Sequence, residues 1–299
     1  MLRTFIVGAM TAFAVHAVAD VSIQRIDYHN WLGCVRMTNG EVDLIYVPQV
    51  GRIMRYGRVG GPNVLWESSR LAGHSSVHAK RGEWANYGGD KLWQSPQSLW
   101  VWPPAPILDG APYEAEVDYK SLVVSGQASA KSGIRFRRRI SLDASGTAVH
   151  IENEMTNTSN HSETLGVWEI TQVNDPDRVY VPLEPTDQMP LGWAEFDEHP
   201  VHSEFVSAAD GWLVVKRNPR EGAKLGTGSS RGVLMAEKAG VRFTITAAKK
   251  YGTYPDDGRF LQVYTNGDPD RYVELEVLGP LTQLRPKETA VLNTIWSLQ

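Results

Sequence analysis

The chain has 299 residues, of which 42% are hydrophobic and 21% charged, and its formal net charge at pH 7 is −4. This composition provides enough apolar side chains for a sizeable core, so it excludes a disordered or fibrous protein. The small excess of acidic residues argues against partners such as nucleic acid or an anionic membrane surface, because both require a basic face.

Residues 1–19 have the pattern of a secretory signal peptide. Arg3 supplies a positive charge, residues 5–15 are apolar or small, and residues 17–19 read Ala-Val-Ala, the small-x-small pattern cut by signal peptidase. The apolar run is too short to cross a bilayer, which takes about 20 residues. We therefore predict cleavage before Asp20, a periplasmic or secreted location, and no membrane attachment after cleavage.

Beyond residue 19, apolar and polar residues alternate with a period of two, and helical periodicity is scarce. Turn-forming pairs such as Asn39-Gly40 and Asp257-Gly258 separate the candidate strands. Many short strands with frequent turns predict an all-β sandwich, and the absence of a linker or repeat predicts a single domain over residues 20–299. The predicted strands are Val42–Val47, Tyr113–Tyr119, Leu122–Ser125, Ile134–Leu142, Ala148–Met155, Leu165–Val173, Gly211–Val215, Val233–Glu237, Val241–Ala247, Phe260–Tyr264, Tyr272–Leu278 and Ala290–Trp296.

Cys34 is the only cysteine in the sequence, so one chain can form neither an internal disulfide bond nor a zinc site with several cysteines. It lies in the strand-like apolar stretch Trp31–Val35. We expect a buried, small hydrophobic side chain here rather than a reactive thiol.

From about Glu67 to Pro112 the alternation breaks down, and the segment is rich in His, Gly, Trp and Pro. A long irregular excursion inside a compact β domain is usually functional. A sugar ring stacks its C–H face on aromatic rings while its hydroxyls need donors and acceptors, and this segment offers both. The alternative is that the rings plug one end of the sandwich. The aromatic residues are Trp84, Tyr87, Trp93, Trp100 and Trp102, and the polar ones are Asp90, Lys91, Gln94 and Gln97.

His74 and His78 precede this aromatic segment, four residues apart. On a helix this spacing can ligate a metal ion, but no helical pattern or third ligand accompanies it. We therefore predict no metal and no cofactor, and either histidine could act as an acid or a base.

The strand Ile134–Leu142 alternates clearly, but Arg138 falls on its apolar face. An arginine there can reach an edge of the sheet or pair with a buried carboxylate. We favour an ion pair.

Two later strands carry candidate acids and bases. In Leu165–Val173, Glu169 and Gln172 lie on opposite faces, which suits either a strand that crosses a cleft or an edge strand. In Tyr272–Leu278, Glu274 and Glu276 share one face. Their mutual repulsion raises the pKa of at least one of them, as a general base requires, although a solvated strand face would have the same pattern.

The order of these motifs resembles a bacterial domain-of-unknown-function family within the galactose-mutarotase-like (aldose 1-epimerase-like) superfamily. The resemblance spans nearly the whole mature chain, and its most specific part is the run Gly-Gly-Asp-Lys-Leu-Trp. The segments that carry it are Gly51–Ile53, Gly88–Trp93, Trp102–Pro104, Asp109–Tyr113, Trp168–Gln172, Glu274–Pro280 and Trp296.

This resemblance implies a galactose-mutarotase-like β supersandwich whose concave face holds carbohydrate. In aldose 1-epimerases of that superfamily a late-strand glutamate takes the anomeric hydroxyl proton, and a middle-strand histidine protonates the ring oxygen. Glu276, or its neighbour Glu274, matches the glutamate, and Arg52 matches an early arginine that contacts substrate. The histidine has no counterpart on the middle strand, so His74, His78 or Lys91 would have to supply the acid.

We therefore expect an exported, aldose 1-epimerase-like protein that acts on a small sugar or an oligosaccharide. One alternative is a periplasmic protein that binds carbohydrate without turning it over. The other is a polysaccharide lyase-like enzyme in which Lys91 and Arg52 neutralise a uronate carboxylate. The sequence does not define the oligomeric state. The expected catalytic residues are Glu276, Glu274 and Glu169, and the expected substrate-binding residues are Arg52, Asp90, Lys91, Trp93, Gln97, Trp102 and Gln172.

Overall fold

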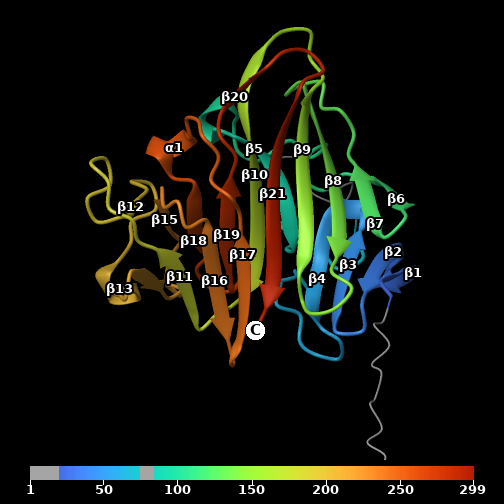
Figure 1. The fold of residues 1–299 in the computed structure, drawn as a ribbon, viewed down its shortest axis with the longest axis horizontal. Coiled ribbons are helices and arrows are strands. Elements are labelled where there is room, and N and C mark those ends of the chain that lie inside the picture. The colour runs from blue at the N-terminus through green and yellow to red at the C-terminus, as the bar shows by residue number, and fades with distance from the viewer. Residues whose placement is uncertain (1–19, 75–83) are drawn as a thin grey trace, which may run out of the picture.

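The computed structural model describes residues 20–74 and 84–299, so the predicted signal peptide and His78 lie outside the described residues. The chain forms two antiparallel sheets that pack face to face, with β21, β9 and β8 in front of β10 and β5 in Figure 1. The largest buried apolar cluster draws side chains from both sheets. This architecture confirms the predicted all-β supersandwich.

The first sheet has eleven strands and carries the candidate site. Along the sheet their order is β1-β2-β3-β4-β5-β10-β19-β18-β15-β12, and β20 pairs with the first residues of β10. The strands are β1 Ser22–Tyr28, β2 Trp31–Thr38, β3 Val42–Val47, β4 Arg52–Arg58, β5 Asp90–Ser95, β10 Glu163–Asn174, β12 Ala194–Glu195, β15 Ala223–Thr227, β18 Leu261–Thr265, β19 Tyr272–Leu278 and β20 Thr282–Leu284.

The second sheet has ten strands, in the order β13-β14-β11-β16-β17-β21-β9-β8-β7-β6. The strands are β6 Glu114–Asp118, β7 Ser121–Ser125, β8 Ile134–Leu142, β9 Val149–Asn157, β11 Arg178–Pro182, β13 Val206–Ala209, β14 Trp212–Val215, β16 Val233–Lys238, β17 Val241–Thr246 and β21 Thr289–Leu298. Among the described residues, helix is confined to short turns, and none is long and apolar enough to cross a bilayer. These turns include η1 Pro48–Val50, η3 Gln97–Leu99, η4 Ser203–Phe205 and α1 Pro255–Gly258.

Alternation predicted the strands well wherever one face is apolar and the other polar. The predicted bounds of β3, β8 and β19 are those of the structure, and Cys34 is fully buried in β2, as expected. In β8, Ile134, Phe136 and Ile140 point into the core because the strand turns every second side chain toward the other sheet.

The segment predicted to be irregular contains a central strand of the first sheet. β5 pairs with β10 from Asp90 opposite Thr171 to Ser95 opposite Gly166. Every residue of β5 is buried, and polar side chains lie on both of its faces. A strand covered on both sides need not alternate, so its sequence lacked the pattern that identified the other strands.

Candidate functional site

The candidate site lies on the outer face of the eleven-stranded sheet, the face that points away from the ten-stranded sheet. Alternation along β5 and β19 turns Leu92 and Leu275 into the core and their chain neighbours to the outer face. The antiparallel register then aligns the outward side chains of neighbouring strands in rows across the sheet. The rows are Trp93–Trp168–Leu278, Lys91–Ile170–Glu276–Gln262 and Gln172–Glu274–Tyr264–Lys224.

Glu276 is fully buried on this face. Its Oε2 accepts hydrogen bonds from the Trp168 indole N–H and from the Lys224 ammonium, both at 3.0 Å. Burial raises the pKa of Glu276 to about 7, the Lys224 charge opposes that rise, and the nearby charge of Glu274 adds to it. Near neutral pH this carboxyl group therefore exchanges readily between its two protonation states, as a general acid or base requires.

Glu274 lies two residues before Glu276 and has its own cation. Its Oε1 accepts from Lys91 Nζ at 3.2 Å and from Gln172 Nε2 at 2.9 Å. The Lys91 ammonium also lies 4.9 Å from the ring centroid of Trp93. Burial lowers the pKa of Lys91, and the Glu274 charge opposes this change. Lys91, Trp93, Gln172, Glu274 and Glu276 thus come together on one face.

The remaining tryptophans of the segment gather around Trp93. Its ring centroid lies 6.0 Å from that of Trp84, 5.6 Å from Trp100, 5.8 Å from Trp102 and 5.4 Å from Trp168. Each pair meets edge to face, the arrangement that aromatic rings favour. Trp102 is 49% exposed, so this cluster extends from the buried site to the surface.

Asp109 joins the predicted Arg52 to this tryptophan cluster. Its Oδ1 accepts from Arg52 Nη2 at 2.7 Å and from Trp93 Nε1 at 3.0 Å, while its Oδ2 accepts from Trp84 Nε1 at 2.7 Å. A second guanidinium nitrogen of Arg52 donates to the Gly88 carbonyl at 2.9 Å. Arg52 is 1% exposed, so it fixes the indoles in place rather than presenting a charge to solvent.

Three expected site residues lie elsewhere. Gln97 is exposed on η3, beyond the end of β5. Asp90 and Glu169 point inward, because each is the chain neighbour of an outward-facing residue, Lys91 and Trp168 respectively. They enclose Arg138 from the second sheet, whose Nη2 lies 2.5 Å from Asp90 Oδ1 and 3.2 Å from Glu169 Oε1. The expected ion pair of Arg138 is confirmed, and Asp90 and Glu169 are its partners on the opposite side of the sheet from Glu276.

Glu169 should make the stability of the protein depend on pH. Burial and then the charge of Asp90 raise its pKa from 4.5 to about 8, against the opposing charge of Arg138. Between pH 4.5 and about pH 8, Glu169 keeps its proton in the folded chain and has lost it in the unfolded chain. The free energy of unfolding therefore falls as pH rises through this interval. We expect Glu169→Gln, measured by urea unfolding at several pH values, to reduce this fall, while Glu276, whose pKa burial also raises, keeps its own contribution.

The exposed Glu116 of β6 provides a control for that experiment. Glu116→Gln should follow the parent protein at every pH. If Glu169→Gln keeps the same pH slope as the parent, Glu169 is ionised in the folded protein and this account of the Arg138 cluster is wrong.

Sequence reasoning missed several residues of the outer face. Alternation places Trp168 on the same face as Gln172, so the sequence could have identified Trp168 as a residue of the outer face. Lys224 lies on β15, a strand whose glycine and short length conceal it, and its ammonium is 4.7 Å from the Trp168 ring centroid and 5.0 Å from that of Phe196. His199 contacts the Tyr264 ring at 5.4 Å between centroids, and its place in an irregular segment gave no signal.

Three buried acceptor oxygens on adjacent strands have no hydrogen-bond partner within the described part of the chain. They are Oε1 of Gln172 on β10, Oε1 of Glu276 on β19 and Oε1 of Gln262 on β18. A buried acceptor without a donor costs about 1–3 kcal/mol, so such groups need an explanation. Hydroxyl groups of a bound ligand would supply the missing donors. No group of three or more His, Cys, Asp or Glu side chains in residues 20–74 and 84–299 could hold a metal ion.

A family model matches most of the sequence. Residues 33–299 match the family model described as domain of unknown function (DUF4380). No curated protein matches the sequence.

Solved structures resemble the fold at low sequence identity. A galactose mutarotase-like protein from Clostridium acetobutylicum has a TM-score of 0.61 and 11% identity over 94% of this chain and 99% of its own. A galactose mutarotase-like protein from Lactobacillus casei has a TM-score of 0.57 and 9% identity over 89% of this chain and 100% of its own. A TPR-domain containing protein from Parabacteroides distasonis has a TM-score of 0.60 and 14% identity over 89% of this chain, but only 47% of its own length is covered. The chain has a galactose mutarotase-like β sandwich and belongs to the DUF4380 family.

Proposed function

We propose that the outer face binds a sugar and interconverts its anomers, as an aldose 1-epimerase does. The observation that carries this proposal is the environment of Glu276: a buried carboxyl group with a pKa of about 7, in contact with the Lys224 ammonium and the Trp168 indole. A base and an acid held together are what the opening of a sugar ring requires.

The chemistry is a pair of proton transfers. Ionised Glu276 takes the proton of the anomeric hydroxyl, the C1–O1 bond becomes a carbonyl, and the bond from C1 to the ring oxygen breaks. We assign Lys224 as the acid that protonates the leaving ring oxygen, because its ammonium lies 3.0 Å from Glu276 Oε2. Rotation about C1–C2 followed by the reverse steps gives the other anomer and restores both groups.

The surroundings suit a sugar ring. Trp102, which packs on Trp93 and is 49% exposed, offers apolar surface for the C–H face of the ring. The unpartnered oxygens of Gln172 and Gln262 can accept hydrogen bonds from its hydroxyl groups. Lys91 and Glu274 form a second pair beside them. The charges of the two lysines and two glutamates balance, which favours a neutral sugar.

Exchange NMR tests this proposal on a panel of free aldoses that includes glucose, galactose and xylose. We expect the mature protein to accelerate exchange between α and β anomers of at least one sugar well above the uncatalysed rate. Unchanged exchange for every sugar, together with no heat of binding in calorimetry, would reject it.

A non-catalytic carbohydrate-binding protein is the second candidate. It is favoured by the ion pairs that both glutamates make with lysines, Glu274 with Lys91 and Glu276 with Lys224, because these contacts hold the carboxylates in place. Calorimetry that gives a sugar affinity while exchange NMR finds no acceleration would establish this candidate instead.

We also propose that the protein works outside the cytoplasm, on the basis of the signal-peptide pattern of residues 1–19. Mass spectrometry of the mature protein from cell fractions should find Asp20 as its first residue. An intact N-terminus in the cytoplasmic fraction would contradict export.

A further inference from the structure

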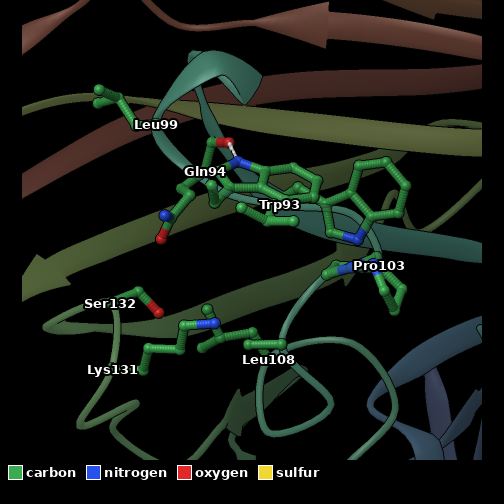
Figure 2. A pocket seen from close by; sticks show the side chains of 11 residues that line it. Trp93, Gln94, Leu99, Pro103, Leu108, Lys131 and Ser132 are labelled. Carbon is green, nitrogen blue, oxygen red and sulfur yellow. Dashed lines mark hydrogen bonds between the residues drawn. The ribbon is translucent and has the colours of Figure 1, made fainter. Parts of the chain in front are cut away.

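A pocket of about 180 Å³ opens at one end of the sandwich, between the two sheets (Figure 2). The segment after β5 forms one wall, and the turn between β7 and β8 forms the other. Gln94 points into the pocket from the core side of β5, the side of Leu92, whereas Glu276 lies on the outer face. The pocket is therefore a separate place in the fold.

The walls of the pocket are mainly apolar. Trp93 and Trp100 present only ring surface, because their indole N–H groups already have acceptors. The Trp93 N–H donates to Asp109 Oδ1 at 3.0 Å. The Trp100 N–H donates to the backbone carbonyl of Gln94, also at 3.0 Å. An apolar cavity of about 150 Å³ binds benzene, so this pocket has room for one substituted six-membered ring. The other apolar lining residues are Leu99, Val101, Pro103, Pro104, Ala105 and Leu108.

Gln94 supplies a hydrogen-bond acceptor inside the pocket. The residue is 9% exposed, and its Oε1 has no hydrogen-bond partner within the described part of the chain. Figure 2 shows its amide group directed toward Ser132 and Lys131 on the opposite side of the pocket. A buried acceptor that lacks a donor points to a ligand that brings one.

Lys131 supplies a cation at the mouth of the pocket, in the turn that faces Gln94. Its side chain is exposed and forms no ion pair or hydrogen bond with any described residue. The hydroxyl group of the neighbouring Ser132 is already paired with that of Ser129 at 2.7 Å. The polar groups left for a ligand are therefore the Gln94 amide and the Lys131 ammonium.

This arrangement does not suit a sugar ring. A pyranose carries hydroxyl groups around most of its edge, and each of them needs a partner when it leaves water. Two polar side chains cannot supply these partners, so most of the hydroxyl groups would face tryptophan, proline and leucine side chains. An aromatic ring has no such groups, and its faces and edges pack well against indole rings.

We propose that this pocket binds a small aromatic acid, a single six-membered aromatic ring that carries a hydroxyl group and a carboxylate. The hydroxyl group donates to Gln94 Oε1, and the carboxylate lies at the mouth beside the Lys131 ammonium. This site goes beyond the proposed function and needs no sugar on the outer face, so each of the two sites can be present without the other.

Calorimetry on the mature protein at pH 7 tests this site with 3-hydroxybenzoate and 4-hydroxybenzoate. We expect at least one of them to bind with a Kd below about 1 mM. It should bind about fivefold more tightly than benzoate, which lacks the donor, and about threefold more tightly than the matching methylphenol, which lacks the charge. Glucose at saturating concentration should not displace it.

Matched variants assign the two polar contacts. Gln94→Leu keeps the side-chain size and breaks no hydrogen bond of the structure, so it should fold normally and abolish the preference over benzoate. Lys131→Met, at an exposed position, should abolish the preference over methylphenol. Gln24→Leu on β1 and Lys216→Met after β14 are exposed and lie outside the pocket lining, so both preferences should remain in these controls.

Several results would overturn this site. They are a Kd above about 1 mM for both hydroxybenzoates, an equal affinity for benzoate, and displacement by glucose, which would make the pocket a sugar site. An unchanged preference over benzoate in Gln94→Leu would place the ligand elsewhere on the protein. None of these results bears on anomer interconversion, so the proposed function would stand.

Discussion

Replacing Glu276 by glutamine is expected to lower kcat/KM for anomer interconversion by about 10²–10⁴-fold, the usual contribution of a positioned general base. The amide has nearly the same shape and can still accept from Trp168 and Lys224 through its oxygen. It cannot take the proton of the anomeric hydroxyl, so binding should survive while turnover is lost. Exchange NMR and calorimetry on the same variant measure the two effects separately.

The pH profile tests the same assignment. In the proposed mechanism Glu276 acts in its ionised form, and burial raises its pKa to about 7, so kcat/KM should rise with pH below that value and level off above it. Lys224→Met removes the cation that lowers this pKa, so the rise should move to higher pH in addition to any loss of the acid. The exposed control Glu116→Gln should keep the parental profile. A loss of less than threefold in Glu276→Gln would remove Glu276 from the mechanism.

Replacing Asp109 by alanine is expected to destabilise the fold by about 3–5 kcal/mol, because removing one partner leaves a buried charge without compensation. Arg52 is 1% exposed and would lose its only carboxylate partner within the described residues. The Trp84 and Trp93 indoles would lose their acceptor at the same time. Urea unfolding followed by circular dichroism gives the change in the free energy of unfolding.

Two further variants test whether the loss of stability comes from the buried charge of Arg52. Asp197→Ala, at an exposed position, should change the free energy of unfolding by less than about 0.5 kcal/mol. The double variant Arg52→Met/Asp109→Leu removes both charges and should recover part of the loss, since buried ion pairs replaced by apolar residues are often neutral. A cost of under about 1 kcal/mol for Asp109→Ala would mean that solvent reaches Arg52.

Sequence patterns predicted the fold and half of the candidate site. Alternation placed Glu274 and Glu276 together because in β19 they alternate with Val273, Leu275 and Val277, which pack into the core. It failed for β5, which has a polar residue on each side, and so could not separate Lys91 from Asp90. The side of a strand that faces a partner sheet depends on contacts far away in the chain, and the sequence of β5 alone does not contain them.

Other parts of the site required tertiary structure. Asp109 lies in a loop, and only the fold brings its carboxylate to Arg52 and Trp93. Lys224 comes from a short strand four places along the sheet from β5, and its long side chain reaches Glu276 across β18. Neither residue has neighbours in sequence that share its role, so no local pattern identifies it.

Arg138 has a consequence for the alignment of the two sheets. The contact of its guanidinium with Glu169 forms only in the register of β10 that directs the Glu169 side chain inward. Shifting β10 by a single residue would place Ile170 beside that charge and turn Glu169 to the outer face, because such a shift turns every side chain of the strand to the opposite face. We therefore expect a one-residue insertion in β10 to prevent folding, so the ion cluster between the sheets secures the geometry of the proposed reaction centre, which it does not touch.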